Sequence, residues 1–272
     1  MPDEAWIARY RKLAPHWWKL WPGRLFGREH IPTHGRFLLV ANHSGLGVAE
    51  CATFPGVWLD AFGDRPLAAM AHGSLFYLPG MGAALRGLGA IPATRADAAR
   101  AVEAGHPLLL FPGGDLEAMR PTWRARDVDF GGRTGFVRLA RDHGLAIVPL
   151  AITGSHVTLP NLAGGRALAW LTGARVIGMH RAPLPVLSIV ATALALHFTR
   201  GASVPRRVAS ALGAFWTVAL VPWIPSEIDF HALEPVTDLG RPDEEVARDV
   251  LERLRSIVSS PLGASEAREG AR

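Results

Sequence analysis

The sequence predicts an α/β fold in which a mixed, largely parallel sheet is flanked by helices. Short apolar stretches alternate with helix-like stretches between residues 36 and 152. Hydrophobic residues make up 49% of the 272-residue chain and charged residues 19%. Such alternation is typical of helices packed on the faces of a sheet, and a chain of this length can bury a large core. Because no internal repeat or clear linker is present, a single main domain is the simplest organisation.

The first stretch, residues 1–22, has the pattern of an amphipathic helix. Aromatic and aliphatic side chains recur there at three- and four-residue steps, and four of the nine tryptophans lie in it. Pro15 should bend or divide this helix. Indole rings favour the bilayer interface and basic side chains favour anionic headgroups, so we expect the helix to dock on a membrane. The alternative is a helix packed on the core of the domain itself.

The following stretch belongs to a domain that we expect to cover residues 23–258. The expected strands lie at 36–41, 67–71, 89–93, 107–111 and 146–152. The expected helices lie at 46–63, 74–87, 95–104 and 133–143. Catalytic groups in such folds tend to follow the carboxyl ends of strands. His43 follows the first expected strand, and a loop with two glycines follows the fourth.

Residues 181–226 form an apolar insertion. No formal charge lies between Arg181 and Arg200 or between Arg207 and Glu227. Each uncharged stretch approaches the length of a membrane span, but prolines interrupt or close both. We expect a shallow membrane-inserted hairpin. Two short spans and a buried helical layer are the alternatives.

The C-terminal part predicts one more strand and one more helix. Residues 226–235 alternate between polar and apolar side chains, which is typical of a strand. Residues 241–258 predict an amphipathic helix with Asp243 as its cap and acidic residues in its first turn. Residues 259–272 contain little apolar material, so we expect a disordered tail.

Charge and cysteine content narrow the classes of function. The net charge is +5 and is carried almost wholly by arginine. A basic surface suits anionic lipid, nucleic acid or anionic substrates, but no nucleic-acid-binding motif is present, so we expect no nucleic-acid partner. The lone Cys51 allows no disulfide within this chain, which fits a reducing compartment, and we expect it to be buried. The scattered histidines form no metal-binding motif, so we expect no metal.

His43 and Glu50 are the two residues whose spacing points to chemistry. If a helix begins soon after His43, seven residues make almost two turns, and both side chains lie on one face. A carboxylate bonded to one imidazole nitrogen fixes the tautomer and leaves the other nitrogen free to accept a proton. The spacing alone also fits a structural pair. Asp60 is a reserve partner, although it lies too far along the chain for the same helical face.

Four blocks resemble, in order, those of the glycerolipid acyltransferase superfamily, the lysophosphatidate-acyltransferase-like enzymes. They lie within residues 24–160 and read EHIPTHGRFLLVANHSG, GLGAIPATR, LLLFPGGDLEAMRPTW and GLAIVPLAITG. The resemblance implies a glycerol-phosphate acyltransferase-like fold and a reaction between an acyl thioester and a lipid hydroxyl. His43 would be the general base and Glu50 its partner. Direct transfer requires no nucleophilic Ser or Cys and no bound cofactor, only acyl-CoA or acyl carrier protein as co-substrate.

The same blocks imply residues that bind the substrate. Glycine N–H groups in the third block, after the fourth expected strand, would hold a phosphate or the developing oxyanion. Arginines at strand ends would meet phosphate, with a solvated surface charge as the alternative for Arg95. The implied substrate-binding residues are Asn42, Ser44, Arg95, Phe111, Pro112, Gly113, Gly114, Asp115 and Arg120.

The chain departs from the pattern of the superfamily at two positions. The usual aspartate five residues after the histidine is Val48 here, and Glu50 is the first acid. The usual Phe-Pro-Glu-Gly has Gly113 in place of the glutamate, which weakens the expectation of headgroup recognition. Asp115 and Glu117 are the candidates to replace that glutamate.

Together these observations predict a membrane-associated O-acyltransferase. Its expected partners are a membrane lipid surface, an acyl-CoA or acyl carrier protein donor, and a lysolipid acceptor. We expect it at the cytoplasmic face of the inner or plasma membrane, as a peripheral or monotopic protein. One alternative is a different acceptor: a diacylglycerol, a lyso-ornithine lipid or a glycolipid. The other is a lipid-binding protein that keeps the fold without catalysis.

Overall fold

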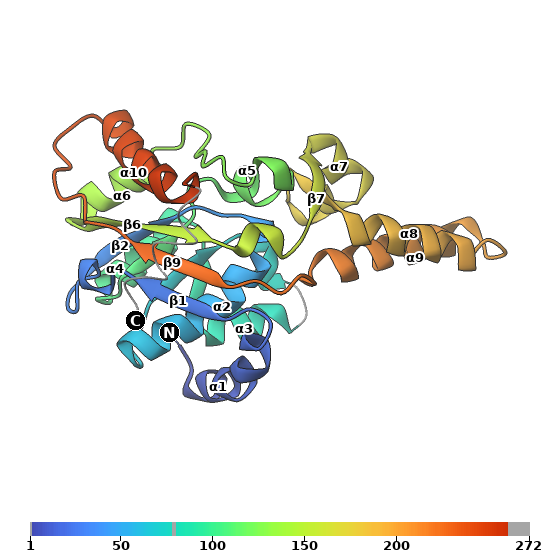
Figure 1. The fold of residues 1–272 in the computed structure, drawn as a ribbon, viewed down its shortest axis with the longest axis horizontal. Helices are drawn as coiled ribbons and strands as arrows, with labels where there is room; N and C mark the ends of the chain where they lie inside the picture. The colour runs from blue at the N-terminus through green and yellow to red at the C-terminus, as the bar shows by residue number, and fades with distance from the viewer. Residues whose placement is uncertain (1, 78–79, 261–272) are drawn as a thin grey trace.

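The protein is built around a seven-stranded sheet, seen here in a computed structural model that describes residues 2–77 and 80–260 (Figure 1). The strand order is β1-β9-β6-β2-β5-β3-β4. Only the β6–β9 pair of this sheet is antiparallel, which confirms the predicted mixed, largely parallel sheet. The strands are β1 (Gly23–Phe26), β2 (Phe37–Ala41), β3 (Ala68–Ala71), β4 (Ala90–Pro92), β5 (Leu108–Leu110), β6 (Ala146–Thr153) and β9 (Ile228–Ala232).

Helices cover both faces of the sheet, and this explains why β2 is apolar at every position. Successive side chains of a strand point to opposite faces. Leu38 and Val40 therefore pack in the core under α4 (Arg95–Glu103), α6 (Gly135–His143) and α10 (Asp243–Val258). Phe37 and Leu39 pack in the core under α2 (Val48–Phe62). A strand buried on both faces shows a continuous apolar run, as residues 37–41 do.

Two local predictions are wrong. The helix expected over 74–87 is instead a short 3₁₀ turn, η3 (Gly73–Tyr77), and a helix, α3 (Met81–Gly87). Gly80 has φ +75°, which a right-handed helix cannot accommodate. Asp243 does not cap α10, because Pro242 occupies the cap position. The Asp243 carboxylate instead accepts a hydrogen bond from Arg141 Nη1 at 2.6 Å. Of the predicted tail, residues 261–272 lie outside the described residues.

The N-terminal helix, α1 (Glu4–Trp18), packs its aromatic face on the domain. It continues through Pro15, so the predicted division does not occur. The Tyr10 hydroxyl donates to the Ala52 carbonyl at 2.8 Å, and Trp17 Nε1 donates to Thr53 Oγ1 at 2.9 Å. This packing corresponds to the alternative of a helix on the core of the domain itself. Leu13 remains exposed, and docking of this helix on a membrane stays a prediction.

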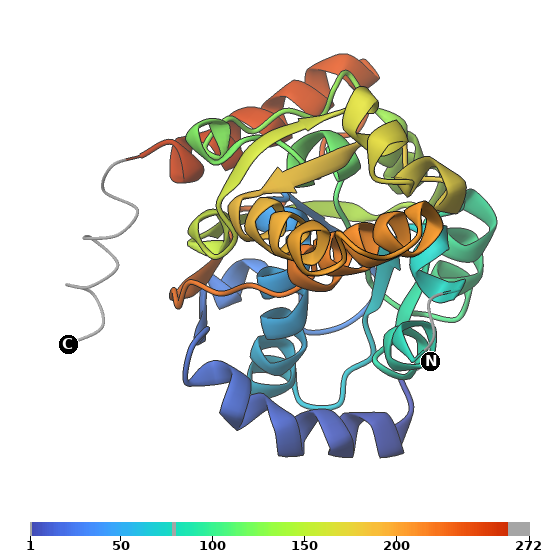
Figure 2. The same ribbon diagram turned by 90° about the vertical axis from the view of Figure 1, so that its right-hand side faces the viewer.

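A helical hairpin projects from the body of the protein, formed by α8 (Val186–Phe198) and α9 (Val204–Ala219) (Figure 1). Figure 2 views the molecule from the end that carries the hairpin, with α10 and α1 on opposite sides. The side chain of Phe198 is 80% exposed and that of Val204 70%. A buried helical layer is therefore wrong for residues 181–226. No helix in the described part of the chain is long and apolar enough to span a membrane. Shallow insertion of the hairpin stays a prediction.

A small second sheet lies at the base of the hairpin. β7 (Asn161–Gly165) and β8 (Ala182–Pro185) pair antiparallel, and α7 (Arg166–Leu171) lies between them in the chain. These elements were not predicted from the sequence. The hairpin is anchored next to the end of β6, because the N–H groups of Trp223 and Ile224 donate to the Thr158 carbonyl.

Candidate active site

Three neighbouring strands end at the same edge of the sheet and bring distant residues together. β5, β2 and β6 are adjacent and parallel, so their carboxyl ends meet there. His43 lies two residues beyond β2, and Phe111 directly follows β5. Ser155 lies two residues beyond β6. The candidate active site is built from these three strand ends.

His43 and Glu50 form the pair that the sequence predicted. His43 Nδ1 is hydrogen-bonded to Glu50 Oε1. The carboxylate is buried and accepts, so Nδ1 carries the proton and Nε2 keeps its lone pair. Nε2 makes no hydrogen bond to any described residue but is not sealed from solvent, and the His43 side chain is 16% exposed. The imidazole can therefore accept a proton from a molecule that reaches Nε2.

Glu50 is held by two serines, Ser44 and Ser155, and Ser155 was not predicted from the sequence. The Ser155 hydroxyl donates to Glu50 Oε2, and the Ser44 N–H donates to Oε1 at 3.3 Å. The two hydroxyl oxygens are 2.7 Å apart. A buried carboxylate needs such partners to offset its lost hydration. The only sequence signal for Ser155 was its position just after the fourth block.

A tight turn and an aromatic ring hold the His43 imidazole in place. In the turn, Leu46 has φ +59° and Gly47 has φ +75°. A Cβ atom on Gly47 would lie 2.0 Å from Cε1 of the imidazole, so only glycine lets the turn pass this close to the ring. On another side the ring of Phe111 stacks on His43, with the ring centroids 4.5 Å apart. The imidazole is therefore held against the residue that begins the glycine loop.

The glycine loop between β5 and α5 (Gly114–Ala118) offers one free backbone donor. Arg133 Nη1 donates to the carbonyls of Pro112 and Gly113, at 2.8 and 2.7 Å. The Pro112 carbonyl and the Gly113 N–H belong to the same trans peptide group, in which they point in opposite directions. Because the Pro112 carbonyl points toward Arg133, the Gly113 N–H points away from Arg133. The Gly113 N–H has no partner among the described residues, whereas the Gly114 N–H donates to the Phe111 carbonyl.

Several residues predicted to bind substrate make hydrogen bonds within the protein. The Asn42 amide accepts from the Ile152 N–H at 2.7 Å and donates to the Ile152 carbonyl at 3.0 Å, which ties β2 to β6. The Ser44 side chain contacts Ser155, as described above. Arg120 Nη2 donates to the His43 carbonyl at 3.1 Å, and its buried guanidinium has a lowered pKa because of desolvation.

Four other residues considered in the sequence analysis lie wholly or partly at the surface. Asp115 is paired with Arg133 at 3.2 Å. Arg95 is exposed at the start of α4 beyond β4, the edge strand, which β5 and β3 separate from β2. Asp60, the reserve partner, is exposed on α2 and is not the carboxylate that meets His43. Cys51, which was expected to be buried, is also exposed, because the helix turns it away from the core.

Glu117, one of the two candidates to replace the missing glutamate of the third block, contacts the backbone of His43. It lies on α5 and is fully buried. Oε2 accepts from the His43 N–H at 3.2 Å, and Oε1 accepts from the Asp129 N–H at 3.0 Å. Arg120 Nη2 lies 3.4 Å from Oε1. Burial raises the pKa of Glu117 to about 7, and the positive charge of Arg120 opposes this rise.

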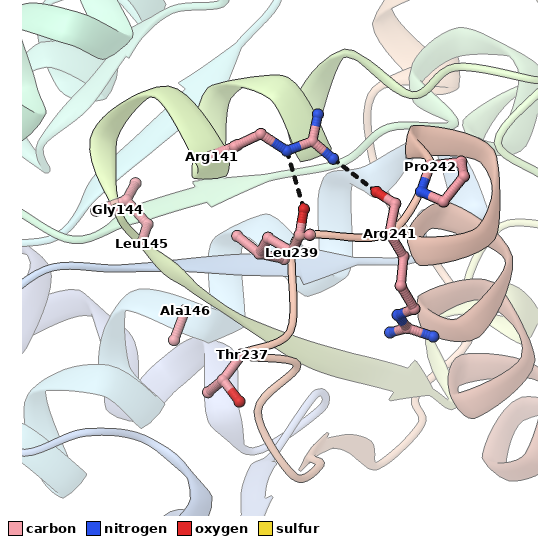
Figure 3. A pocket seen from close by; sticks show the side chains of 9 residues that line it. Arg141, Gly144, Leu145, Ala146, Thr237, Leu239, Arg241 and Pro242 are labelled. Atoms are coloured by element: carbon pink, nitrogen blue, oxygen red, sulfur yellow. Dashed lines mark hydrogen bonds between the residues drawn. The ribbon is translucent and has the colours of Figure 1, made fainter.

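Two hollows stand out on the described part of the surface. The larger, of about 930 Å³, lies between the start of β6 and the loop before α10 (Figure 3). The Arg141 guanidinium in it donates to the carbonyls of Leu239 and Arg241, both at 2.9 Å. Because His43 lies beyond the opposite end of the parallel strands, this hollow is separate from the candidate active site.

The second hollow, of about 430 Å³, lies beside the glycine loop. Among its lining residues are Asp115, Arg133, Arg166, Arg175, His180 and Arg181. Arg166 and Arg181 make no ion pair or side-chain hydrogen bond within the described residues, so the hollow carries uncompensated positive charge. We refer to it as the basic pocket. Among the described residues no group of three or more His, Cys, Asp or Glu side chains could hold a metal ion.

Comparisons with known proteins agree with this geometry. The acyltransferase family model matches residues 24–153, which contain His43, Glu50 and the glycine loop. The structure is similar to the crystal structure of the 1-acyl-sn-glycerophosphate (LPA) acyltransferase PlsC from Thermotoga maritima. The TM-score is 0.54, and 18% of the residues are identical. The similarity covers 93% of this chain and 78% of that one and shows a shared fold.

Two curated relatives match about half of this chain. An uncharacterized protein of Mycobacterium leprae is 32% identical over 153 residues, covering 54% of this chain and 40% of the relative. The "DGAT1/2-independent enzyme synthesizing storage lipids" of Bos taurus is 26% identical over 153 residues, covering 56% of this chain and 45% of the relative. This chain therefore matches less than half the length of these relatives.

Proposed function

Because the acyltransferase family model matches residues 24–153, we propose that the protein is a membrane-associated O-acyltransferase of the glycerolipid acyltransferase superfamily. It transfers a fatty acyl group from acyl-CoA or acyl carrier protein to the hydroxyl of a lysophospholipid or related glycerolipid. The observation that carries this proposal is the His43–Glu50 pair, whose unpaired Nε2 lies beside the glycine loop.

In the proposed reaction the oxygen of the acceptor hydroxyl attacks the thioester carbonyl, and His43 Nε2 accepts the proton of that hydroxyl. The carbonyl becomes a tetrahedral oxyanion, and in this proposal the Gly113 N–H, which has no partner among the described residues, donates to it. Glu50 stabilises the imidazolium that forms. When the intermediate collapses, the C–S bond breaks and the imidazolium returns its proton to the thiolate. An ester and a free thiol are the products, and no acyl-enzyme forms.

The identity of the acceptor is best tested by direct assay. Purified protein would be given radiolabelled acyl-CoA with lysophosphatidate, other lysophospholipids, diacylglycerol, a lyso-ornithine lipid and a glycolipid. We expect an acylated lysophospholipid. Esterified diacylglycerol as the sole product would favour the storage-lipid chemistry in the name of the Bos taurus relative. Lipid binding without acylation of any acceptor, with acyl carrier protein also tried as donor, would favour the lipid-binding alternative.

The basic pocket supports a substrate that carries phosphate. Arg166 and Arg181 lie outside the region matched by the family model, so this part of the pocket is contributed by the β7–α7–β8 segment. We predict that replacing both arginines with alanine raises the KM of the phosphate-bearing substrate by about 10-fold or more, because each charged hydrogen bond contributes about 1.5–3 kcal/mol. The value of kcat should change little.

The control for this prediction is Arg248→Ala, which removes an exposed arginine from α10. Separate titrations of donor and acceptor identify which of them supplies the phosphate. An increase in the KM of acyl-CoA alone assigns the pocket to coenzyme A, and an increase for the lysolipid alone assigns it to the headgroup. Unchanged KM values for both substrates would contradict the prediction.

The α8–α9 hairpin is the surface that we propose for membrane docking. It exposes Leu194, Phe198, Val204 and Val208, and basic side chains lie near its tip, at Arg200, Arg206 and Arg207. Exposed apolar side chains next to basic ones suit an anionic bilayer surface. The donor thioesters are cytosolic, so we place the protein at the cytoplasmic face of the membrane.

We predict that Phe198→Asp with Val204→Asp abolishes co-flotation with vesicles of phosphatidylglycerol and phosphatidylethanolamine. The carboxylates would have to enter the interface, which is unfavourable. The matched control is Leu13→Asp, which places a charge on the exposed face of α1 instead. Loss of flotation in the control but not in the hairpin variant would move the docking surface to α1. Flotation of both variants would contradict docking by either helix.

A further inference from the structure

The carboxylate of Glu117 occupies the space that a side chain on Gly113 would need. A Cβ atom on Gly113 would lie 2.1 Å from Glu117 Cγ and 2.2 Å from Oε2. Gly113 has φ −66° and ψ −29°, a conformation that every residue adopts easily. The backbone therefore does not require glycine at this position. Glycine is required because Glu117 reaches back from α5 and fills the site.

Glu117 and Arg120 together hold the backbone on both sides of His43. Glu117 Oε2 accepts from the His43 N–H, and Arg120 Nη2 donates to the His43 carbonyl. The two side chains also contact each other. One charged pair thus fixes the peptide groups before and after His43. Since a side chain leaves the backbone between these two peptide groups, their orientation sets the direction of the imidazole.

We propose that Glu117 is a positioning residue for His43. Its carboxylate reaches from α5 into the space that is free because residue 113 has no side chain. This inference rests on the proposed function, because it concerns how accurately His43 meets the substrate. Glu117 also fastens the segment at Asp129 through the second carboxylate oxygen. It therefore holds the imidazole, the glycine loop and the chain at Asp129 in fixed positions relative to one another. Glu117 does not itself touch the substrate.

The inference predicts an effect on kcat rather than on binding. With Glu117→Gln the side-chain oxygen can still accept one N–H, but the amide nitrogen meets a second donor. We expect kcat to fall about 10- to 100-fold, the scale on which misplacement of a catalytic group by about 1 Å acts. KM should stay within about twofold, because the substrate contacts are unchanged.

A relocated carboxylate should restore the function. An aspartate at position 113 carries its oxygens two bonds beyond Cβ, which is close to the place where Glu117 Oε2 lies. We therefore expect Glu117→Ala alone to lose activity, and Gly113→Asp alone to lose activity by collision with Glu117. The double variant Gly113→Asp/Glu117→Ala should recover at least one tenth of the wild-type kcat. Thermal unfolding of all variants separates loss of folding from loss of positioning.

The titration of Glu117 gives a readout that is independent of turnover. The groups that face its carboxylate are the Arg120 guanidinium, the His43 imidazole and the N–H groups of His43 and Asp129. A raised carboxyl pKa means that the folded state holds its proton more tightly than the unfolded state. The free energy of unfolding should therefore fall as the pH rises from about 4.5 to about 7, and this slope should be smaller in Glu117→Gln.

The decisive experiment combines kinetics with NMR chemical shifts of the His43 imidazole. We expect Glu117→Ala to alter the imidazole chemical shifts, and Gly113→Asp/Glu117→Ala to return them toward wild type. If Glu117→Gln and Glu117→Ala keep wild-type kcat and imidazole shifts, the inference is wrong. If the double variant folds but restores neither kcat nor the chemical shifts, the claim that the Glu117 carboxylate acts from the side-chain space of residue 113 is wrong. An inactive wild type whose His43 shifts still respond to Glu117 would overturn the proposed function alone.

Discussion

Replacement of His43 with glutamine is expected to lower kcat for acyl transfer by about 10²- to 10⁴-fold, the range that a general base contributes. Glutamine can still accept a hydrogen bond, but it cannot take up the proton of the acceptor hydroxyl. KM for both substrates should change little, because Nε2 is proposed to act on the reacting proton only. Initial rates with acyl-CoA and the preferred acceptor, measured under saturation, give this comparison.

The partner of the imidazole provides a matched pair of variants on one helix. Glu50→Gln should lower kcat by about 10²-fold or more, since a neutral amide no longer stabilises the imidazolium. Asp60→Asn removes the exposed carboxylate of the same helix and should leave kcat unchanged. If His43→Gln retains more than a tenth of the wild-type kcat, the catalytic role of His43 is disproved, and the lipid-binding alternative becomes the better account.

Gly47→Ala is also expected to have a large effect, although the residue carries no functional group. A methyl group there would lie 2.0 Å from Cε1 of His43, so either the turn or the imidazole must move. The left-handed φ of +75° adds about 1–2 kcal/mol of backbone strain for an L-residue. We expect kcat to fall about 10²-fold, as for displacement of a catalytic group by about 1 Å. Kinetics and thermal unfolding together measure both effects.

Gly144→Ala is the control for backbone strain alone. Gly144 has φ +62°, and an added Cβ would meet no described atom within 4 Å. It lies directly after α6 and before β6, at the edge of the sheet opposite to the one that carries His43. This variant should lose a similar amount of stability and keep its kcat. Equal kcat values for Gly47→Ala and Gly144→Ala would contradict the close packing of the turn on the imidazole.

The central strands of the sheet could be predicted because buried strands consist of continuous apolar residues. β2 and β6 are covered on both faces, so their residues are continuously apolar, and both strands were located to within a residue or so. β1, β7 and β8 were missed because they are short and contain glycine, proline or polar residues, which are unfavourable in strands. α1 was located correctly, but its aromatic face alone did not reveal whether it would meet a membrane or α2.

The same contrast holds within the candidate site. His43 and Glu50 lie seven residues apart, so the geometry of one turn and one helix was enough to pair them. Ser155 lies 105 residues from Glu50, and Glu117 lies 74 residues from His43. No local pattern connects such residues, because the order of strands in the sheet decides which strand ends become neighbours.

The sequence by itself therefore determined the α/β class, the central strands and the His43–Glu50 pair, since each depends on spacing along one or two elements. Only the tertiary structure decided what surrounds the imidazole: the serine that holds Glu50, the phenylalanine under the ring, and the buried carboxylate beneath the glycine loop. It also decided that the apolar insertion is an exposed hairpin. The physical reason is that periodicity records which side of an element avoids water, whereas contacts between distant elements depend on how the whole chain packs.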